Sequence, residues 1–243
     1  MLATGGKAMP TKIPEYITSI QINGSDAAAQ RPMLALESAR VFAKWANVEF
    51  VLASAVSMIV GDATALALID KFKAKNAQYD AIKITLEGRI SCAEVQSLIS
   101  PLFKLMNKAA EPRNKLAHSL WGTIEELPEA LLLTEPKAAL KMSRYMLSGG
   151  GPTKTWVDDD NKTNFERGFE DNIDLANEMI NVLRDGTEVW VHNDFNEPLR
   201  LLDYSIVALS FFTTAASAKT NSSEAIQALD GLRKILSDTN VLR

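Results

Sequence analysis

Apolar residues in this chain recur mostly at steps of three and four, the spacing that gathers them on one face of an α-helix. One unbroken stripe of this kind starts at Val41, passes through Trp45 and Leu52, and ends at Ile59. It predicts a long amphipathic helix that begins near Pro32 and ends at Gly61. The same period predicts further helices over 63–75, 95–109, 163–184, 199–216 and 222–238.

Residues 79–88 fit two patterns. Ile82, Ile84 and Leu86 alternate as in a strand, whereas Tyr79, Ile82 and Leu86 have the spacing of a helix. Helical neighbours on both sides favour a helix. Pro101 lies inside the next helical stretch, where it predicts a kink or a later helix start, because proline removes a backbone donor.

Strand signals are fewer. The segment 126–136, "ELPEALLLTEP", is short, apolar and bounded by prolines, and 187–191, "TEVWV", is rich in β-formers. Thr163 and Glu166 have the spacing of a capping box, which would open the helix that runs to Arg184 and stops at Gly186. Strand should therefore be confined largely to 124–157 and 186–192.

These patterns predict a mainly helical, all-α chain with a small extended insertion. Residues 1–31 hold several glycines and prolines without a sustained period, and we interpret them as a mobile arm. A helical domain is expected over 32–185, with the extended insertion at 123–160. A helical C-terminal extension, 186–243, would pack on that core.

The composition limits the classes of function and the location that are expected for this chain. Lysine and arginine number 26 against 30 acidic residues, a net charge of −4, which argues against broad nucleic-acid binding but allows a local basic patch. Cys92 is the only cysteine, so no intrachain disulfide can form. The first residues lack a signal-peptide core, and the longest apolar run, Phe50–Val60, is too short to span a bilayer. We expect a cytoplasmic protein without a membrane segment.

Several chemical motifs fail on their spacing. "GGGPTKT" has a threonine where a phosphate loop needs the glycine before lysine, and "DDDNKTNFE" lacks the phasing of a calcium loop. One cysteine and two histidines at unpaired spacing predict no metal site, and we expect no cofactor. His192 is interpreted as an ordinary residue at a strand end.

The stretch 111–122, "EPRNKLAHSLWG", concentrates polar chemistry. Pro112 suits the first turn of a helix, which would put Arg113 and Asn114 at a helix N-terminus, where exposed N–H groups favour phosphate. Asn114 and His118 are four residues apart and would share a helix face. The segment is also locally basic, through Lys104, Lys108 and Lys115.

Within this stretch, "RNKLAH" is similar to the signature of the HEPN superfamily (higher eukaryotes and prokaryotes nucleotide-binding domains): arginine, a polar residue, three others, histidine. The order of elements also resembles that superfamily, with a long amphipathic helix, further helices, and then the motif. "RNKLAHSLWG" looks like the variant found in many small bacterial proteins. Leu120 departs from one toxin subgroup, which has a tyrosine two residues after the histidine.

The resemblance implies metal-independent RNA cleavage by a HEPN-type ribonuclease, a toxin or an antiviral effector. His118 would be the general acid or base, Arg113 would stabilise developing charge, and Asn114 would orient His118 or bind phosphate. The three lysines would bind RNA. HEPN nucleases are typically dimers with a shared site, so a homodimer is implied, and an antitoxin or other regulator is an expected partner.

Other interpretations stay open. A non-catalytic HEPN-like dimer could bind a partner protein or RNA through the same surface, or the insertion at 123–160 could sense a small ligand. In a purely structural interpretation Asn114 caps a helix, His118 hydrogen-bonds inside the core, and Trp121 packs. Glu37 and Glu49 are expected to be solvated charges, although one of them could approach His118.

Overall fold

The computed structural model describes residues 10–16, 20–22, 24–72, 74–149, 154–157, 163–166, 173–218 and 222–242. Within these ranges the chain is mainly helical, as its periodicity predicts, with nine α-helices, one short 3₁₀ helix and seven short strands. It divides into two compact units. Unit 1 comprises residues 1–37 and 115–194, and unit 2 comprises 38–114 and 195–243.

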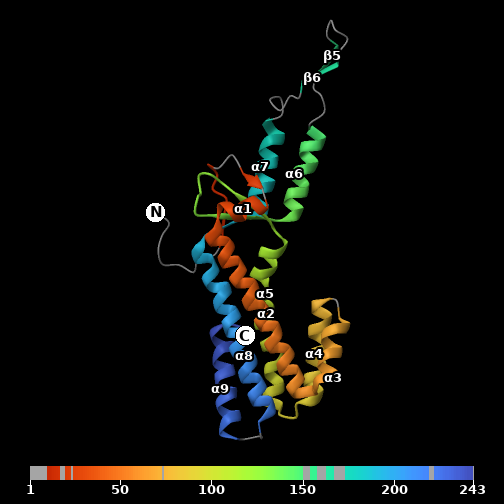
Figure 1. Cartoon of the computed structure of the whole chain (residues 1–243), viewed down its shortest axis with the longest axis vertical. Helices are drawn as coiled ribbons and strands as arrows, with labels where there is room; N and C mark the ends of the chain where they lie inside the picture. The colour runs from red at the N-terminus through yellow and green to blue at the C-terminus, as the bar shows by residue number, and fades with distance from the viewer. Residues whose placement is uncertain are drawn as a thin grey trace. The chain divides into compact units, whose positions relative to one another are not determined.

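Unit 2 is built from helices. They are α2 (Pro32–Val60, in this unit from Ser38), α3 (Asp62–Lys71), α4 (Lys75–Arg89), α5 (Ala93–His118, in this unit to Asn114), α8 (Asn196–Ser217) and α9 (Ser223–Asp238). Helices α8 and α9 lie side by side (Figure 1). The stripe predicted on α2 is its buried face, since Val41, Trp45, Val48 and Leu52 are all buried.

Helix α4 settles the ambiguous segment 79–88 as helix. Tyr79, Ile82 and Leu86 are buried, whereas Ile84 is 70% exposed. A strand would have placed Ile84 on the same face as Ile82 and Leu86, so the helical spacing decides which residues enter the core.

Unit 1 contains a five-stranded antiparallel sheet in the order β1-β7-β4-β3-β2. The strands are β1 (Thr11–Lys12), β7 (Thr187–Trp190), β4 (Leu131–Thr134), β3 (Leu120–Thr123) and β2 (Gln21–Ile22). Leu132 lies opposite Val189 in the register, and both join a buried apolar cluster with Ile13, Ile124 and Ala130. Both predicted strand segments, 126–136 and 187–191, are therefore present as β4 and β7.

The rest of unit 1 is helical apart from one hairpin. Helix α1 spans Ser25–Gln30, and the 3₁₀ helix η1, His192–Phe195, begins in this unit directly after β7. Helices α6 (Pro136–Gly149) and α7 (Ile173–Gly186) lie side by side (Figure 1). Between them in sequence, β5 (Lys154–Val157) pairs antiparallel with β6 (Thr163–Glu166).

The structure corrects the expectation of a mobile arm over 1–31. In its described part this segment supplies strands β1 and β2 and helix α1. Strand β1 pairs with β7, and β2 pairs with β3. Two-residue strands are too short to show an alternating pattern, and their partners are far away in sequence. No local sequence pattern therefore predicts them.

Other boundaries also differ from the prediction. Thr163 and Glu166 lie in β6, and the following helix α7 begins at Ile173, because backbone pairing with β5 takes up the residues that resemble a capping box. Strands β3 and β6 also lie outside the ranges predicted for strand.

The two units divide the chain at other positions than the predicted domain boundaries at 31 and 185. The glycine loop near 150–153 and the acidic segment 158–162 lie outside the described residues.

Helix α5 runs without interruption from Ala93 to His118 and contains both Pro101 and Pro112. The prediction that a helix starts near Pro112 is therefore wrong. The missing proline N–H groups leave the helix intact, because buried residues hold the turns beside each proline: Leu102 and Leu105 after Pro101, and Ala109 and Leu116 on either side of Pro112.

Candidate functional site

The motif "RNKLAH" lies at the C-terminal end of α5. Arg113 and Asn114 are the last residues of this helix in unit 2, and Lys115 to His118 belong to unit 1. A helix C-terminus presents carbonyl groups and the negative end of the macrodipole, which favours cations. The helix N-terminus that we expected to bind phosphate is therefore not available here, and any phosphate binding depends on side chains.

Four residues of the longer string "RNKLAHSLWG" have structural tasks within unit 1. Leu116 is buried, and the indole Nε1 of Trp121 donates a hydrogen bond to the Leu116 carbonyl over 2.9 Å. A Cβ atom on Gly122 would lie 2.5 Å from the carbonyl oxygen of Gln21 in the neighbouring strand β2. Trp121 thus closes the end of α5, and Gly122 permits the close approach of β2.

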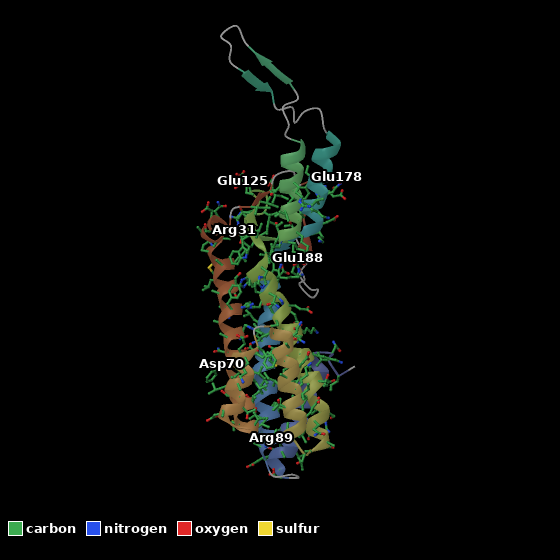
Figure 2. The ribbon with its side chains drawn as sticks, turned by 90° about the vertical axis from the view of Figure 1, so that its right-hand side faces the viewer. Arg31, Asp70, Arg89, Glu125, Glu178 and Glu188 are labelled. Atoms are coloured by element: carbon green, nitrogen blue, oxygen red, sulfur yellow. The ribbon has the colours of Figure 1, made fainter. Side chains whose placement is uncertain are left out.

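The fourth of these residues, Lys115, forms an ion pair with Glu188, which is labelled in Figure 2. The other carboxylate oxygen of Glu188 accepts a hydrogen bond from Trp190 Nε1 over 3.1 Å. Lys115 was expected to bind RNA, but its charge is already balanced on strand β7.

Arg113 lies half-buried in unit 2. Its Nη1 donates a hydrogen bond to Oδ1 of the exposed Asn114 over 3.1 Å, whereas its buried Nε has no hydrogen-bond partner among the described residues. No ion pair joins this guanidinium to a carboxylate in the described part of the chain. A partly desolvated cation without an acidic partner is favourably placed for an anion, because weak solvent screening strengthens the attraction.

The side chain of His118 is exposed in unit 1. It makes no hydrogen bond or ion pair with any residue that the structure describes. The interpretation of His118 as a histidine that hydrogen-bonds inside the core is therefore wrong.

The expected RNA-binding lysines differ in their availability. Lys108 donates a hydrogen bond to the carbonyl of Thr239 at the end of α9 over 3.0 Å, and Lys115 is paired as described above. Lys104 is exposed and has no such partner within the described ranges. Of the three, Lys104 retains the most freedom to contact a ligand.

Of the two acidic residues of α2, Glu49 keeps the expected solvent exposure and Glu37 does not. Glu49, in unit 2, forms an ion pair with Lys75 over 2.7 Å. Glu37, in unit 1, is only 4% exposed, and its Oε1 lies 3.8 Å from Nδ1 of His192. The buried carboxylate thus faces His192, which starts η1.

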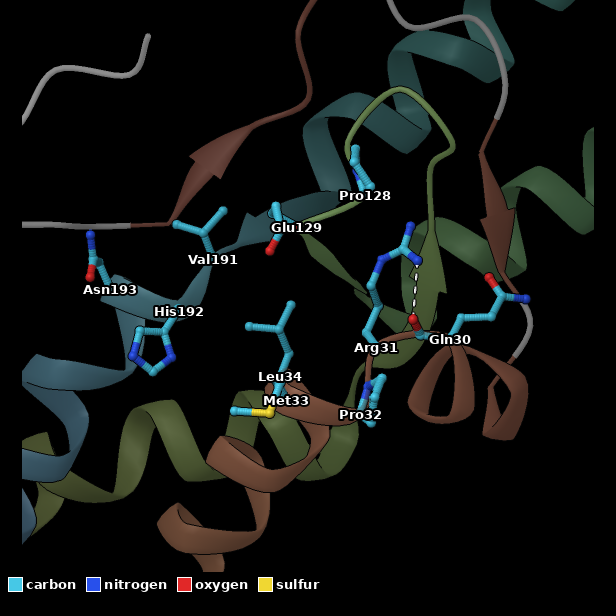
Figure 3. Close-up of a pocket in the computed structure, with 10 residues that line it drawn as sticks. All are labelled: Gln30, Arg31, Pro32, Met33, Leu34, Pro128, Glu129, Val191, His192 and Asn193. Atoms are coloured by element: carbon cyan, nitrogen blue, oxygen red, sulfur yellow. Dashed lines mark hydrogen bonds between the residues drawn. The ribbon is translucent and has the colours of Figure 1, made fainter.

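A pocket of about 550 Å³ lies in unit 1 beside this pair (Figure 3). Its lining includes Arg31, Met33 and Leu34 at the start of α2, and Val191 and His192 after β7. Sequence reasoning missed it, because its walls come from distant parts of the chain and Arg31 carries no motif.

Asp194 fixes the turn that carries His192. One of its carboxylate oxygens accepts a hydrogen bond from the backbone N–H of Val191 over 2.8 Å. Burial raises the pKa of the Asp194 carboxyl above its ordinary value, and the charge of Glu188 adds to this, although the bond from Val191 acts in the opposite direction.

Comparison of the chain with models of protein families, with curated proteins and with solved structures finds no match. Among the described residues, no three or more histidine, cysteine or acidic side chains gather as they would around a metal ion.

Proposed function

We propose that this protein is a metal-independent endoribonuclease of HEPN type, a bacterial toxin or antiviral effector. The observation that carries the proposal is that some residues of "RNKLAHSLWG" have structural roles in unit 1 whereas the two signature residues, Arg113 and His118, do not. Lys115, Leu116, Trp121 and Gly122 are occupied by ion pairing, packing, helix closure and strand approach. Among the described residues, the His118 side chain has no hydrogen-bond or ion-pair partner, and Arg113 bonds only to Asn114 of the same motif.

The proposed reaction is an internal transesterification of RNA. The ribose 2′-oxygen attacks the adjacent phosphorus as its proton passes to a base, and the bond to the 5′-oxygen breaks as an acid protonates that oxygen. His118 serves as the base or the acid, and Arg113 stabilises the negative charge that develops on the phosphoryl oxygens. Asn114 accepts a hydrogen bond from Arg113 and positions its guanidinium.

This chemistry calls for two proton-transfer groups, and the motif supplies one imidazole per chain. A homodimer with its two-fold axis near Arg113 and His118 would supply two, because a two-fold axis brings each surface patch against its own copy. Dimerisation therefore belongs to the proposed mechanism. Lys104 would contact the RNA backbone beside this site.

The first experiment is an RNA cleavage assay in the presence of EDTA. His118→Ala and Arg113→Ala should each abolish cleavage, and Asn114→Ala should weaken it less. His192→Ala is the matched control, since it removes the other exposed histidine and should leave cleavage intact. Because His118 is exposed, its replacement should change stability by no more than about 0.5 kcal/mol.

Two results would contradict the proposal. One is cleavage by His118→Ala at the wild-type rate, and the other is a loss of activity that only accompanies unfolding. Light scattering tests the dimer, and mixed dimers that carry one His118→Ala chain test whether the site is shared. A strictly monomeric protein that cleaves RNA would refute the shared site.

A second candidate is a non-catalytic helical dimer that binds a partner protein. Three large apolar side chains of unit 2 favour it: Phe50 and Met58 on α2 and Ile84 on α4 are exposed by 71%, 69% and 70%. An apolar surface of this kind marks an interaction site where the side chains form one contiguous patch. A regulator or antitoxin would bind there, and a stable complex without RNA cleavage would favour this candidate.

We propose a cytoplasmic location. Two helical stretches, Pro32–Val60 and His192–Ser217, are long and apolar enough to cross a bilayer, a test that a core helix also passes. Within the first, Lys44 pairs with Asp203 and Glu49 pairs with Lys75. Charged residues paired with neighbouring helices favour a helix inside a folded bundle. Fractionation of the native host cells would test the location.

A further inference from the structure

The pocket in unit 1 has a positive charge in its wall that the described protein does not neutralise. Arg31 donates three hydrogen bonds, all to backbone carbonyls: Nε to Ala130 over 3.1 Å, Nη2 to Ile124 over 3.1 Å, and Nη1 to Gln30 over 3.2 Å. No carboxylate pairs with it among the described residues. The guanidinium is therefore held in one orientation with its full charge, and two of its five N–H groups remain for a ligand.

On another side of the pocket stands His192. Figure 3 shows its ring and Arg31 on opposite sides, with Leu34 between them. The buried carboxylate of Glu37 lies 3.8 Å from Nδ1, so the charge on that side orients the imidazole. The other ring nitrogen, Nε2, is then the one that can hydrogen-bond a ligand.

The floor between these two groups is apolar. Leu34 is 5% exposed, Val191 is half-buried, and Met33 is exposed beside them. A volume of about 550 Å³ is in the range of pockets that hold small organic ligands. Glu129 also lines the pocket, and its negative charge disfavours ligands that carry several negative charges.

We propose that this pocket binds a small organic monocarboxylate with an apolar, ring-sized body. The carboxylate binds Arg31, the body covers Leu34 and Val191, and a polar group at the far end hydrogen-bonds His192. A guanidinium with fixed orientation prefers a planar carboxylate, and apolar walls strengthen the attraction by excluding water. The site is independent of RNA cleavage, and His118→Ala should leave it intact.

Three probes that differ by one group test the proposal by calorimetry on the full chain: phenylacetate, phenylacetamide and 4-hydroxyphenylacetate. Phenylacetate should bind with one molecule per chain. Phenylacetamide should bind roughly ten- to hundredfold more weakly, because it lacks the charge that Arg31 recognises. The 4-hydroxy compound should bind more tightly than phenylacetate, because its hydroxyl reaches His192. The methyl resonance of Met33 should shift on binding.

Variants separate the two ends of the pocket. His192→Phe keeps a ring and should abolish the advantage of the 4-hydroxy compound while leaving phenylacetate binding nearly unchanged. Glu129→Gln should tighten phenylacetate binding. Arg144→Gln, an exposed arginine on α6, is the control and should change nothing. Equal binding of acid and amide, no saturable binding of any probe, or a hydroxyl advantage that survives His192→Phe would each overturn the proposal.

Discussion

Gly122→Ala should detach strand β2 from β3, because no space exists for even one added methyl group. The new Cβ would lie 2.5 Å from the Gln21 carbonyl oxygen and 3.3 Å from the Ile22 Cα atom, both backbone atoms that no side-chain rotation can move. The backbone N–H of Gly24 also donates to the Trp121 carbonyl over 3.0 Å, so the displaced strand would lose this bond too.

The size of the effect follows from these contacts. Forcing one extra methyl group into a filled site costs about 1–3 kcal/mol, since the neighbouring backbone must shift. Because β2 lies at the sheet edge, the loss should appear first as local opening of 20–24 and 120–123. A cost of this size corresponds to roughly 5- to 150-fold faster amide exchange in those segments.

Hydrogen exchange followed by mass spectrometry measures the amide exchange rate of each segment directly. Gly88→Ala is the control, because Gly88 is an exposed glycine inside α4 with nothing within 4 Å of the added Cβ. Alanine there should slow exchange in α4, with a gain of about 0.5–1 kcal/mol from helix propensity.

If Gly122→Ala leaves exchange in 20–24 unchanged, β2 is not held against Gly122 in solution. Residues 1–31 would then behave as the mobile arm that their composition predicts, and the five-stranded sheet would be refuted at this edge. Slower exchange in the same segments would contradict the steric argument altogether.

Three further predictions concern stability. Thr134→Val should cost about 1–3 kcal/mol in thermal unfolding, because the buried Thr187 hydroxyl, now 2.9 Å away, would lose its partner, whereas replacing both by valine should be nearly neutral. Ser222→Ala removes the side-chain cap of α9 and should cost about 1 kcal/mol, seen as faster exchange in that helix's first turn. Asp194→Asn should raise thermal stability at neutral pH, and this gain should shrink as the pH falls from the raised native pKa of Asp194 toward about 3.9, the unfolded-state value, and should be absent below it. The sign follows because a raised pKa lets the unfolded chain ionise first, so this group's stability contribution falls as pH rises.

The helices of unit 2 follow from the sequence because their signal is local. A three-to-four period over several turns specifies which face of α2 is buried, and Val41, Trp45 and Val48 lie in the core as the period predicts. The same reasoning resolves α4, where Ile84 is exposed. Propensity and spacing need no information about distant residues in these cases.

Nothing local specifies the sheet edges. Thr11 pairs with Val189, and Gln21 pairs with Thr123, across most or nearly half of the chain. Each edge strand is two residues long, so the pairing depends on partners that β4 and β7 bring into position. The local rule for Pro112 failed for a related reason, since burial of neighbouring turns keeps α5 helical.

The candidate sites divide in the same way. The sequence singled out Arg113, Asn114 and His118 by their residue types and by their similarity to the HEPN signature. Which lysines remain available depends on nonlocal partners: Lys108 is bound to the Thr239 carbonyl and Lys115 is paired with Glu188. The pocket of Arg31 and His192 exists only after folding. Its polar groups lie far apart in sequence, and only the tertiary structure turns them toward a common space.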